Sequence, residues 1–258
     1  MSDLMILKLG GSVITDKSTS YATADEKNIE LIANEILKCK KDFNFKLIIV
    51  HGAGSFGHPL AKKYQNDLKE IDFKGVYEIH ESMKILNELI IRSLRRVGIK
   101  ALPIHPMGLI VADNSRIKLM QTESIYCMLE NGFVPVLHGD VVMDKTLGAS
   151  IISGDQLLTH IGMKLNAKRI GFSSNVDGVF DESGKVIKKI TNSNFKNVEM
   201  HIKGSKNIDV TGGMREKVIE ILNLSKLGFT TYIFNATVTN NISKFLSGKD
   251  IGTEIKWD

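Results

Sequence analysis

Short runs of aliphatic and β-branched residues recur along the chain, and each run is bounded by Gly, Pro or Asn. Runs of this length and composition are typical of buried β-strands. The predicted strands are Leu4–Leu9, Leu47–Val50, Ala101–Ile104, Val134–Leu137, Arg169–Phe172 and Thr230–Phe234.

Segments with helical periodicity lie between these runs. Thr23 and Glu26 match the capping-box pattern at the start of a helix. The apolar positions that follow fall on one helical face: Ile29, Ile32, Ala33, Ile36 and Leu37. Further helices are predicted over residues 73–97 and 214–227. Strands that alternate with helices of this length predict an α/β fold with right-handed crossovers, in which helices cover both faces of a largely parallel sheet.

Two segments interrupt this alternation. Residues 141–152 have the pattern of a β-hairpin whose turn contains Asp144, Lys145 and Gly148. Residues 181–184 have the composition of a turn between short strands.

The length of the chain bears on its domain organisation. At roughly 150 residues per domain, 258 residues allow one large domain or two small ones. A weak boundary near residues 160–170 predicts two lobes, 1–160 and 161–258, on one continuous sheet.

The composition and net charge of the chain indicate which kind of ligand it binds. Hydrophobic residues make up 43% of the chain and charged residues 24%, which is typical of a globular protein. The net charge of +5 is modest and spread along the chain, so it does not indicate a nucleic-acid-binding protein. A small anionic ligand, held by a few lysines, fits this charge better.

Several features bear on location. No apolar run approaches the ~18 residues that a membrane span needs, and the initial MSDLMILKLGG lacks the pattern of a secretory signal. Cys39 and Cys127 are the two cysteines of the chain, which is typical of a reducing compartment. Since no CxxC, HExxH or Cys/His cluster is present, a zinc site is not expected. We expect a cytoplasmic protein.

The first glycine-rich segment, Lys8-Leu9-Gly10-Gly11-Ser12, directly follows a predicted strand. Ligands bind at the carboxyl ends of parallel strands, and glycine lets backbone N–H groups approach phosphate oxygens. Lys8 lies inside an apolar strand, which costs free energy unless its ammonium group meets an anion. The alternative is a lysine whose stem packs on an edge strand while its ammonium group reaches water.

Residues 11–18 nearly match the P-loop pattern GxxxxGK[ST], but Asp16 replaces the second glycine. Its carboxylate would occupy the place of a phosphate, so a P-loop is excluded. Lys17 stays a candidate cation for the same crevice, and an exposed loop lysine is the alternative.

The most informative single motif is HGAGSFGH, residues 51–58, which follows the second predicted strand. Its glycines indicate a strand-to-helix turn with accessible amides, which is a favourable anion site. We predict that a helix follows over residues 59–64. His58, near the start of that helix, is placed to donate to a phosphate oxygen, whereas His51 is expected to be structural.

Three weaker signals lie downstream. Ser153-Gly154-Asp155 opens a predicted helix, where Asp155 is also a candidate N-cap. Residues 173–179, SSNVDGV, follow another strand. Residues 209–214, DVTGGM, lead into a helix that carries Lys217 one turn in. A cation there opposes the helix dipole, so Lys217 either faces solvent or binds an anion.

Taken in order, KLGGS, HGxG, SGD, VDGV and TGGMxxK resemble the amino acid kinase family over essentially the whole chain. Within that family, the chain is most similar to the members that phosphorylate isopentenyl phosphate. The pieces that carry this closer match are ITDK (14–17), HGAGSFGH, VPVLHGD (134–140) and DVTGGM. Kinases of fosfomycin look similar in the same regions.

The resemblance implies an open αβα sandwich whose N-terminal lobe binds the phosphoryl acceptor and whose C-terminal lobe binds ATP. It implies catalytic roles for Lys8, Lys17, Asp155 and Lys217. Asp155 would position the lysines at positions 8 and 217. The implied ATP contacts are Lys8, Gly10, Gly11, Ser12, Gly54, Asn175, Asp177, Gly213 and Lys217. The implied acceptor contacts are His58, which would hold the acceptor phosphate, together with Ala53 and Gly154.

The chemistry of the acceptor agrees with this set of residues. A phosphate oxygen is already nucleophilic near neutral pH, so the reaction needs positioning and charge stabilisation rather than a general base. The resemblance implies Mg²⁺ together with ATP. Because no carboxylate cluster is present, we expect nucleotide oxygens and water to hold the ion, with no metal ligand from the protein.

Two positions depart from the pattern of the family. Gln156 follows Asp155 where relatives often have a second acidic residue, and Asn175 stands where relatives often have Asp. Asn175 can still form a hydrogen bond with a base or ribose, so ATP binding is retained as an expectation and nucleotide preference stays open.

The five-carbon tail of the acceptor requires an apolar wall near the phosphate. Val76 and Ile79 lie three residues apart on a predicted helix, and Val141 and Ile151 lie across the predicted hairpin. Each is a candidate for that wall, and ordinary core packing is the alternative for each.

Other classes of protein fit the sequence less well. Residues 52–57 satisfy the bare GxGxxG pattern of dinucleotide-dependent oxidoreductases, but they follow the second strand rather than the first. A nucleotide-binding protein without activity would not need all of Lys8, Lys17, Asp155 and Lys217. The strongest competitor is a kinase of the same fold with another acceptor, such as a phosphonate antibiotic. The family also implies a homodimer as the default assembly.

Overall fold

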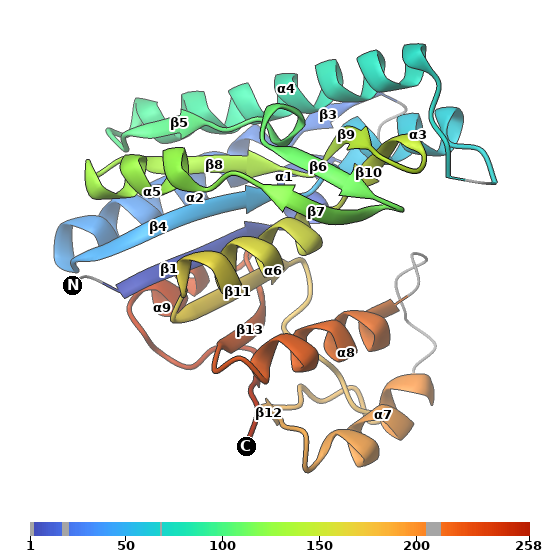
Figure 1. Cartoon of the computed structure of the whole chain (residues 1–258). Helices are drawn as coiled ribbons and strands as arrows, with labels where there is room; N and C mark the ends of the chain where they lie inside the picture. The colour runs from blue at the N-terminus through green and yellow to red at the C-terminus, as the bar shows by residue number, and fades with distance from the viewer. Residues whose placement is uncertain (1–2, 17–20, 68, 205–212) are drawn as a thin grey trace.

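The computed structural model describes residues 3–16, 21–67, 69–204 and 213–258. One large sheet contains eight of the described strands: β1 (Asp3–Leu9), β4 (Phe45–His51), β5 (Ala101–Pro103), β8 (Val134–His138), β11 (Arg169–Ser174), β12 (Lys189–Ile190), β13 (Thr230–Asn235) and β14 (Thr253–Ile255). Their order is β12-β14-β13-β11-β1-β4-β8-β5 (Figure 1). The six strands from β13 to β5 run parallel, and β14 pairs antiparallel to β13. The predicted α/β fold with a largely parallel sheet is confirmed, and the predicted strands shift by only one or two residues.

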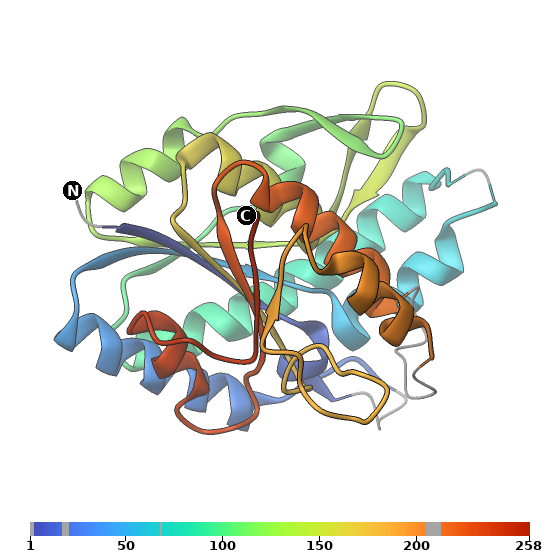
Figure 2. The same ribbon diagram turned by 90° about the horizontal axis from the view of Figure 1, so that it is seen from below.

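Helices lie on both faces of this sheet, as the alternation predicted. They are α1 (Gly11–Ile14), α2 (Glu26–Asp42), α3 (Gly54–Tyr64), α4 (Phe73–Arg96), α5 (Glu123–Glu130), α6 (Gly154–Leu165), α7 (Phe195–Gly204), α8 (Gly213–Ser225) and α9 (Asn241–Leu246), with one 3-10 turn at Pro106–Gly108. Side chains of α2, α4 and α9 pack in one hydrophobic cluster, and side chains of α5, α6, α7 and α8 pack in the other. Figure 2 shows α7 and α8 side by side near the C-terminal strands.

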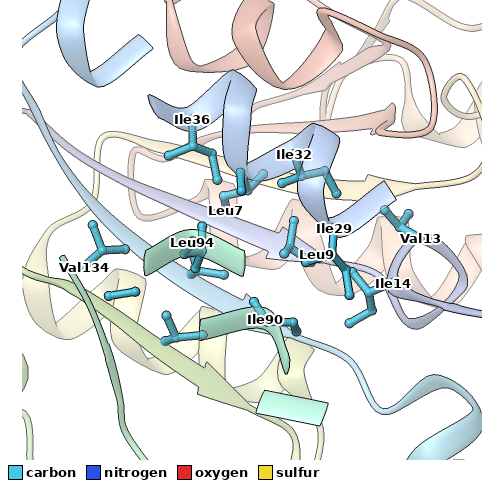
Figure 3. Packing of buried hydrophobic residues seen from close by; sticks show 14 of the residues in the cluster. Leu7, Leu9, Val13, Ile14, Ile29, Ile32, Ile36, Ile90, Leu94 and Val134 are labelled. Atoms are coloured by element: carbon cyan, nitrogen blue, oxygen red, sulfur yellow. The ribbon is translucent and has the colours of Figure 1, made fainter. Parts of the chain in front are cut away.

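The period of two along β1 decides which residue faces which layer. Leu7 and Leu9 belong to the cluster under α2 and α4, and Figure 3 shows them beside residues of both helices. Leu4 and Ile6 belong to the opposite cluster. Lys8 has the same parity as these two residues, so its side chain lies on the face covered by α6.

A second, four-stranded sheet lies beside the large one. It contains β6 (Ile110–Asp113), β7 (Arg116–Met120), β9 (Asp140–Asp144) and β10 (Gly148–Ile152) in the order β10-β9-β6-β7. The predicted hairpin over residues 141–152 is confirmed as β9–β10. The β6–β7 hairpin was not predicted, because its turn contains Asn114 and Ser115 at positive φ instead of glycine.

The Asp144 carboxylate joins the turns of these two hairpins. It accepts hydrogen bonds from the backbone N–H groups of Asn114 and Ser115 in one turn and from those of Thr146 and Leu147 in the other. It also accepts one from the Ser150 hydroxyl at 2.7 Å. Burial raises the pKa of Asp144, but these hydrogen bonds outweigh burial and hold the pKa well below its usual range.

Two predicted helix starts are wrong. The N-cap of α2 is Asp25, whose Oδ1 accepts from Asn28 N at 3.0 Å. The capping box expected at Thr23 is absent because Thr23 pairs in a short strand, β3 (Thr23–Ala24), with β2 (Thr15–Asp16). The third helix, α3, begins at Gly54 rather than at Pro59, which lies inside it. Hence most of the HGAGSFGH motif is helical.

The large sheet is continuous across the region where a lobe boundary was expected. β1 pairs with β4 on one side and with β11 on the other, and α6 spans residues 154–165. Among the helices in the described part of the chain, none is both long enough and apolar enough to cross a membrane.

Candidate active site

A cavity of about 350 Å³ lies at the carboxyl ends of β1, β4, β8 and β11. This is the position at which open parallel sheets bind ligands. Its walls include the predicted site residues Lys8, Gly10, Gly11, Ser12, Ala53, Gly54, His58, Gly154, Asp155 and Lys217. The structure therefore brings together motifs that are up to 209 positions apart in the chain, counted from Lys8 to Lys217.

The glycines of this site allow three loops to contact one another through backbone atoms. Gly10 N donates to Ser173 O at 3.1 Å, and a Cβ at Gly10 would lie 2.6 Å from that same oxygen. A Cβ at Gly11 would lie 2.5 Å from Gly54 N. Gly54 itself has φ +49°, which is in the left-handed region that favours glycine. The sequence predicted glycine here for access to phosphates, and packing between the loops is a second reason.

Lys8 forms an ion pair with Asp155 inside the cavity. Lys8 Nζ lies 2.5 Å from Asp155 Oδ1, and the two side chains are 10% and 26% exposed. Burial raises the pKa of Asp155, but the charges of Lys8 and Lys217 and the hydrogen bond from Lys8 outweigh burial and lower the pKa. Asp155 is therefore a carboxylate that faces two lysines.

The alternative role of Asp155 as an N-cap is wrong. The N-cap of α6 is Ser153, whose hydroxyl accepts from Gln156 N at 3.1 Å. This arrangement frees the carboxylate in the first turn of α6 to face Lys8. Lys217 reaches the same cavity from α8 and is half-buried.

His58 lies on α3 with its side chain exposed, in the wall of the cavity. Its helix packs closely on α4. Ser82 Oγ donates to Phe56 O at 2.8 Å, and a Cβ at Gly57 would lie 3.0 Å from Met83 Sδ. Gly57 thus lets α3 approach α4, which places His58 in the cavity wall.

Only two of the four candidates for an apolar wall line the cavity. Ile79 and Ile151 are in its lining, whereas Val76 is partly buried against the main core and Val141 lies within that core. Met83 and Ile152 also line the cavity and were not predicted. Periodicity could not separate them from core residues, because the cavity wall continues the core.

Other predicted residues lie outside the cavity or outside the described part of the chain. Asn175 and Asp177 are exposed beyond the end of β11 and are not in the cavity lining. Asp177 Oδ1 accepts from Asn235 Nδ2 at 2.9 Å. Lys17 lies outside the described residues. Gly213 is the first described residue of α8.

Two buried histidines lie behind the cavity loops. His51 and His138 are register partners at the ends of β4 and β8, and their rings stack with centroids 5.4 Å apart. In each histidine, Nδ1 donates to the carbonyl oxygen of the following glycine at 3.0 Å. This arrangement was not predicted from the sequence. The signal that could have predicted it is the His-Gly pair repeated at two strand ends.

Burial controls the charge of these histidines. It lowers the pKa of His51 to about 4 and lowers the pKa of His138 well below its usual value. His138 Nε2 lies 3.0 Å from His105 Nδ1. Nearby, His80 Nδ1 lies 2.9 Å from Asp140 Oδ2, and Asp140 is part of the cavity lining. Within the described segments, no three His, Cys, Asp or Glu residues are arranged to hold a metal ion.

A comparison with known families identifies the class of protein to which this fold belongs. Residues 3–235 match the amino acid kinase family, and the chain belongs to that family.

Individual proteins are similar to this chain over nearly its whole length. The chain is 41% identical to isopentenyl phosphate kinase of Methanocaldococcus jannaschii, with 98% of each chain covered. It is 39% identical to isopentenyl phosphate kinase of Haloferax volcanii, also with 98% of each covered. Among solved structures, an isopentenyl phosphate kinase superimposes with a TM-score of 0.78 at 32% identity, covering 98% of this chain and 100% of that one.

Proposed function

We propose that this protein transfers the γ-phosphoryl group of ATP to isopentenyl phosphate and forms isopentenyl diphosphate and ADP. The observation that carries the proposal is a single cavity lined both by Lys8, Asp155 and Lys217 and by the apolar side chains of Ile79 and Ile151. A short prenyl phosphate has the same two parts, an anionic head and an apolar tail. Relatives named for this activity, 41% and 39% identical over nearly the whole chain, support it.

The transfer step needs no general base. An oxygen of the acceptor phosphate attacks the γ-phosphorus, a new O–P bond forms, and the bond to the bridging oxygen breaks with its electron pair leaving on ADP. Negative charge builds on the transferred group and on the leaving oxygen, so cations that meet this charge lower the barrier. Lys8 and Lys217 take this role, and we assign Lys17 to the transferring group. The 2.5 Å contact with Asp155 orients the Lys8 ammonium group.

We assign the acceptor phosphate to His58, Ala53 and Gly154. His58 is exposed in the cavity wall, where its ring can donate a charge-assisted hydrogen bond to a phosphate oxygen. Ala53 and Gly154 are both in the cavity lining, and a Cβ at Gly154 would lie 3.1 Å from His51 O.

For ATP we assign the phosphates to Gly10, Gly11, Ser12 and Gly54, beside the two cavity lysines. Asn175, Asp177 and Gly213 are assigned to the nucleoside side, beyond the end of β11 and at the start of α8. In this arrangement, residues 1–160 hold the acceptor and also contact the phosphates of ATP, and residues 161–258 hold the nucleoside side of ATP. The boundary between these two ranges separates binding sites, and the sheet continues across it.

We propose that Mg²⁺ enters with ATP. The carboxylates in the described cavity lining are Asp140 and Asp155, and each already has a partner, His80 at 2.9 Å and Lys8 at 2.5 Å. This donor set fits an ion that is held by nucleotide oxygens and water, as Mg²⁺ permits. Bound there, the ion would neutralise phosphate charge.

The acceptor tail is assigned to Ile79 and Ile151, joined by Met83 and Ile152. Val76 and Val141 are removed from this assignment because neither is in the cavity lining. Four apolar side chains around a small cavity favour a short hydrocarbon tail over a polar amino acid.

The test is a phosphorylation assay with ATP, Mg²⁺ and a panel of acceptors. The panel contains isopentenyl phosphate, dimethylallyl phosphate, fosfomycin, UMP and acetylglutamate. We expect the highest kcat/KM for isopentenyl phosphate. Preferential turnover of fosfomycin would support the competing assignment within the same fold, and turnover of UMP or acetylglutamate alone would overturn both. An absence of turnover with every acceptor, with ATP binding intact, would favour a non-catalytic nucleotide-binding protein.

We also propose a location and an assembly for this protein. Cys39 and Cys127 are free thiols, which supports a cytoplasmic location. We propose a homodimer on the basis of the family resemblance. Light scattering coupled to gel filtration, at several protein concentrations, distinguishes a dimer from the 28.6 kDa chain.

A further inference from the structure

Thr15 lies where three parts of the site meet. It is the C-cap of α1 and the first residue of β2, and it is 4% exposed. Its hydroxyl donates to Gly11 O at 2.6 Å and accepts from Ser55 N at 3.1 Å. One side chain thus connects the loop that follows β1 to the first turn of α3.

The bond to Ser55 supplies a cap that α3 lacks locally. The first N–H groups of a helix have no partner within the helix and usually bond to the side chain of the N-cap residue. The N-cap of α3 is Ala53, which makes no such bond. Thr15, from 40 residues earlier in the chain, accepts from Ser55 N instead.

Gly54 makes this connection possible. A Cβ at Gly54 would lie 2.1 Å from Thr15 Oγ1, so the threonine side chain occupies the space that any larger residue would need. Gly11 also approaches Gly54 closely, so both glycines lie next to the Thr15 side chain. The two glycine loops are therefore packed around one hydroxyl group.

Ser55 extends the connection to the β2–β3 strand pair. Its hydroxyl donates to Thr23 O at 3.3 Å, and Thr23 N lies 3.2 Å from Ser55 Oγ. Loss of the Ser55 hydroxyl removes this link but leaves Ser55 N bonded to Thr15. Ser55 is therefore a matched control that separates the two connections.

We propose that Thr15 is a positioning residue for phosphoryl transfer, which fixes the loop of Gly10–Ser12 relative to α3. This inference rests on the proposed function, in which the loop holds the phosphates of ATP and His58 of α3 holds the phosphate of the acceptor. Transfer requires both phosphates at one fixed separation, and a misplacement of about 1 Å can cost about 100-fold in rate. Thr15 is not in the cavity lining and acts through Gly11 and Ser55.

The test compares Thr15→Val, which keeps the shape and removes the hydroxyl, with Thr15→Ser, which keeps the hydroxyl. We expect Thr15→Val to lower kcat by about 10- to 100-fold, with the KM values for ATP and acceptor changed by less than about threefold. Thr15→Ser is expected to recover most of the lost kcat. Ser55→Ala should keep near wild-type kcat, since its N–H still donates to Thr15.

Two results would overturn the proposal. One is a Thr15→Val enzyme with wild-type kcat, and the other is a Thr15→Ser enzyme as impaired as Thr15→Val, which would indicate packing alone. Circular dichroism and thermal unfolding confirm the fold of each variant. If Thr15→Val does not fold, Thr15→Ala removes the same hydroxyl without adding a methyl group next to Gly54, and the same outcomes apply.

The acceptor panel keeps this test separate from the proposed function. Failure of the wild-type enzyme on isopentenyl phosphate would reject the proposed substrate. The comparison of Thr15 variants would then be made with whichever acceptor the wild-type enzyme phosphorylates. A selective loss of kcat would still support the positioning role.

Discussion

Lys8 and Asp155 are 147 positions apart in the chain, and their charged groups are 2.5 Å apart in the cavity. Lys8 is one of the polar residues in the core of the large sheet, where an unpaired ammonium group is costly. The strand places Lys8 on the α6 face, and the Ser153 cap leaves Asp155 available to meet it. The energetic anomaly that marked Lys8 in the sequence is thus resolved by a partner inside the candidate active site.

Removal of either cavity lysine should act on the rate more than on binding. We expect Lys8→Ala and Lys217→Ala each to lower kcat by about 100- to 1,000-fold, which is typical for the loss of one group that stabilises developing charge. Steady-state kinetics with varied ATP and acceptor would measure the split between kcat and KM. A raised KM for the acceptor with normal kcat would contradict this role.

A matched control for the lysine variants is Lys46→Ala. Lys46 also pairs with a carboxylate, that of Glu130 at 2.5 Å, but on the surface of the protein. Exposed ion pairs contribute about 0–1 kcal/mol, so this variant should keep wild-type kcat and nearly wild-type stability.

His58 should be specific for the acceptor. A charge-assisted hydrogen bond is worth about 1.5–3 kcal/mol, so His58→Ala should lose at least about tenfold in kcat/KM for isopentenyl phosphate at 1.4 kcal/mol per decade. His58→Gln should fall between, because it keeps a donor but no charge. The KM for ATP should stay near normal. Wild-type kinetics in a folded His58→Ala enzyme would remove His58 from the acceptor site.

The contrast to His58 is His51, which is fully buried and donates to Gly52 O. His51→Gln is expected to lower the thermal midpoint, which is the signature of a residue that supports a loop. A His51 variant of normal stability with a selective loss of acceptor binding would reverse these two assignments.

The tail wall can be tested through chain length. Ile79 lines the cavity, whereas Val76, three residues earlier on α4, is partly buried against the core and is not in the cavity lining. Ile79→Ala should raise kcat/KM for ten- and fifteen-carbon prenyl phosphates relative to isopentenyl phosphate, and Val76→Ala should leave that ratio unchanged. Because Ile79 is buried, its truncation should also cost about 2–5 kcal/mol of stability, so assays belong well below the unfolding midpoint. Equal ratios in the two variants would show that Ile79 does not bound the acceptor tail.

Stability should fall as pH falls from about 6.5 to about 4. His51 has a pKa of about 4 in the folded protein, whereas an unfolded histidine titrates near 6.5. Between pH 6.5 and pH 4, His51 binds a proton in the unfolded chain but not in the folded protein. This difference lowers the free energy of unfolding by on the order of 3 kcal/mol over that pH range. His138 acts in the same direction, and Asp140, whose pKa burial raises, acts in the opposite one.

Urea unfolding at a series of pH values would measure this dependence. The slope between pH 6.5 and 4 should be smaller in His51→Gln than in the wild-type protein. Equal slopes in the two proteins would show that another group carries the effect.

Asp144 should be important for stability rather than for catalysis. Its carboxylate accepts four backbone N–H groups and one hydroxyl from two hairpins. A hydrogen bond to a charged group contributes about 1.5–3 kcal/mol, so the loss of several in Asp144→Ala should cost at least about 3 kcal/mol in chemical denaturation. The control is Asp113→Ala, which loses one exposed hydrogen bond, to Thr146 Oγ1. Similar losses in both variants would contradict the role of Asp144.

Much of the fold follows from the sequence because the strands of the large sheet are apolar and sharply bounded. Six described strands were missed. β2, β3, β12 and β14 have only two or three residues each, which is too short for an apolar pattern. β6 and β7 contain charged residues such as Arg116 and turn through Asn114-Ser115, so neither apolar pattern nor glycine marks them. The start of α2 was misplaced because Asp25 caps that helix better than Thr23 does.

The candidate site was predicted to the extent that unusual residue types mark it. Lys8 in an apolar strand and the glycines next to strands were visible in the chain. The role of Thr15 was not, because a threonine that bonds Gly11 and Ser55 has no local signature. Met83 was likewise indistinguishable from core residues until the cavity beside it was known.

The ladder around β1 has a consequence for dividing this protein. Met5–Leu9 pair with Arg169–Ser173, and Asp3–Leu9 pair with Phe45–His51. A fragment that ends at residue 160 would expose the whole β11 edge of β1, and unpaired edges of this kind promote aggregation. We therefore expect residues 1–160 and 161–258 to fold as one unit, because the strand that joins them, β1, needs partners from both ranges.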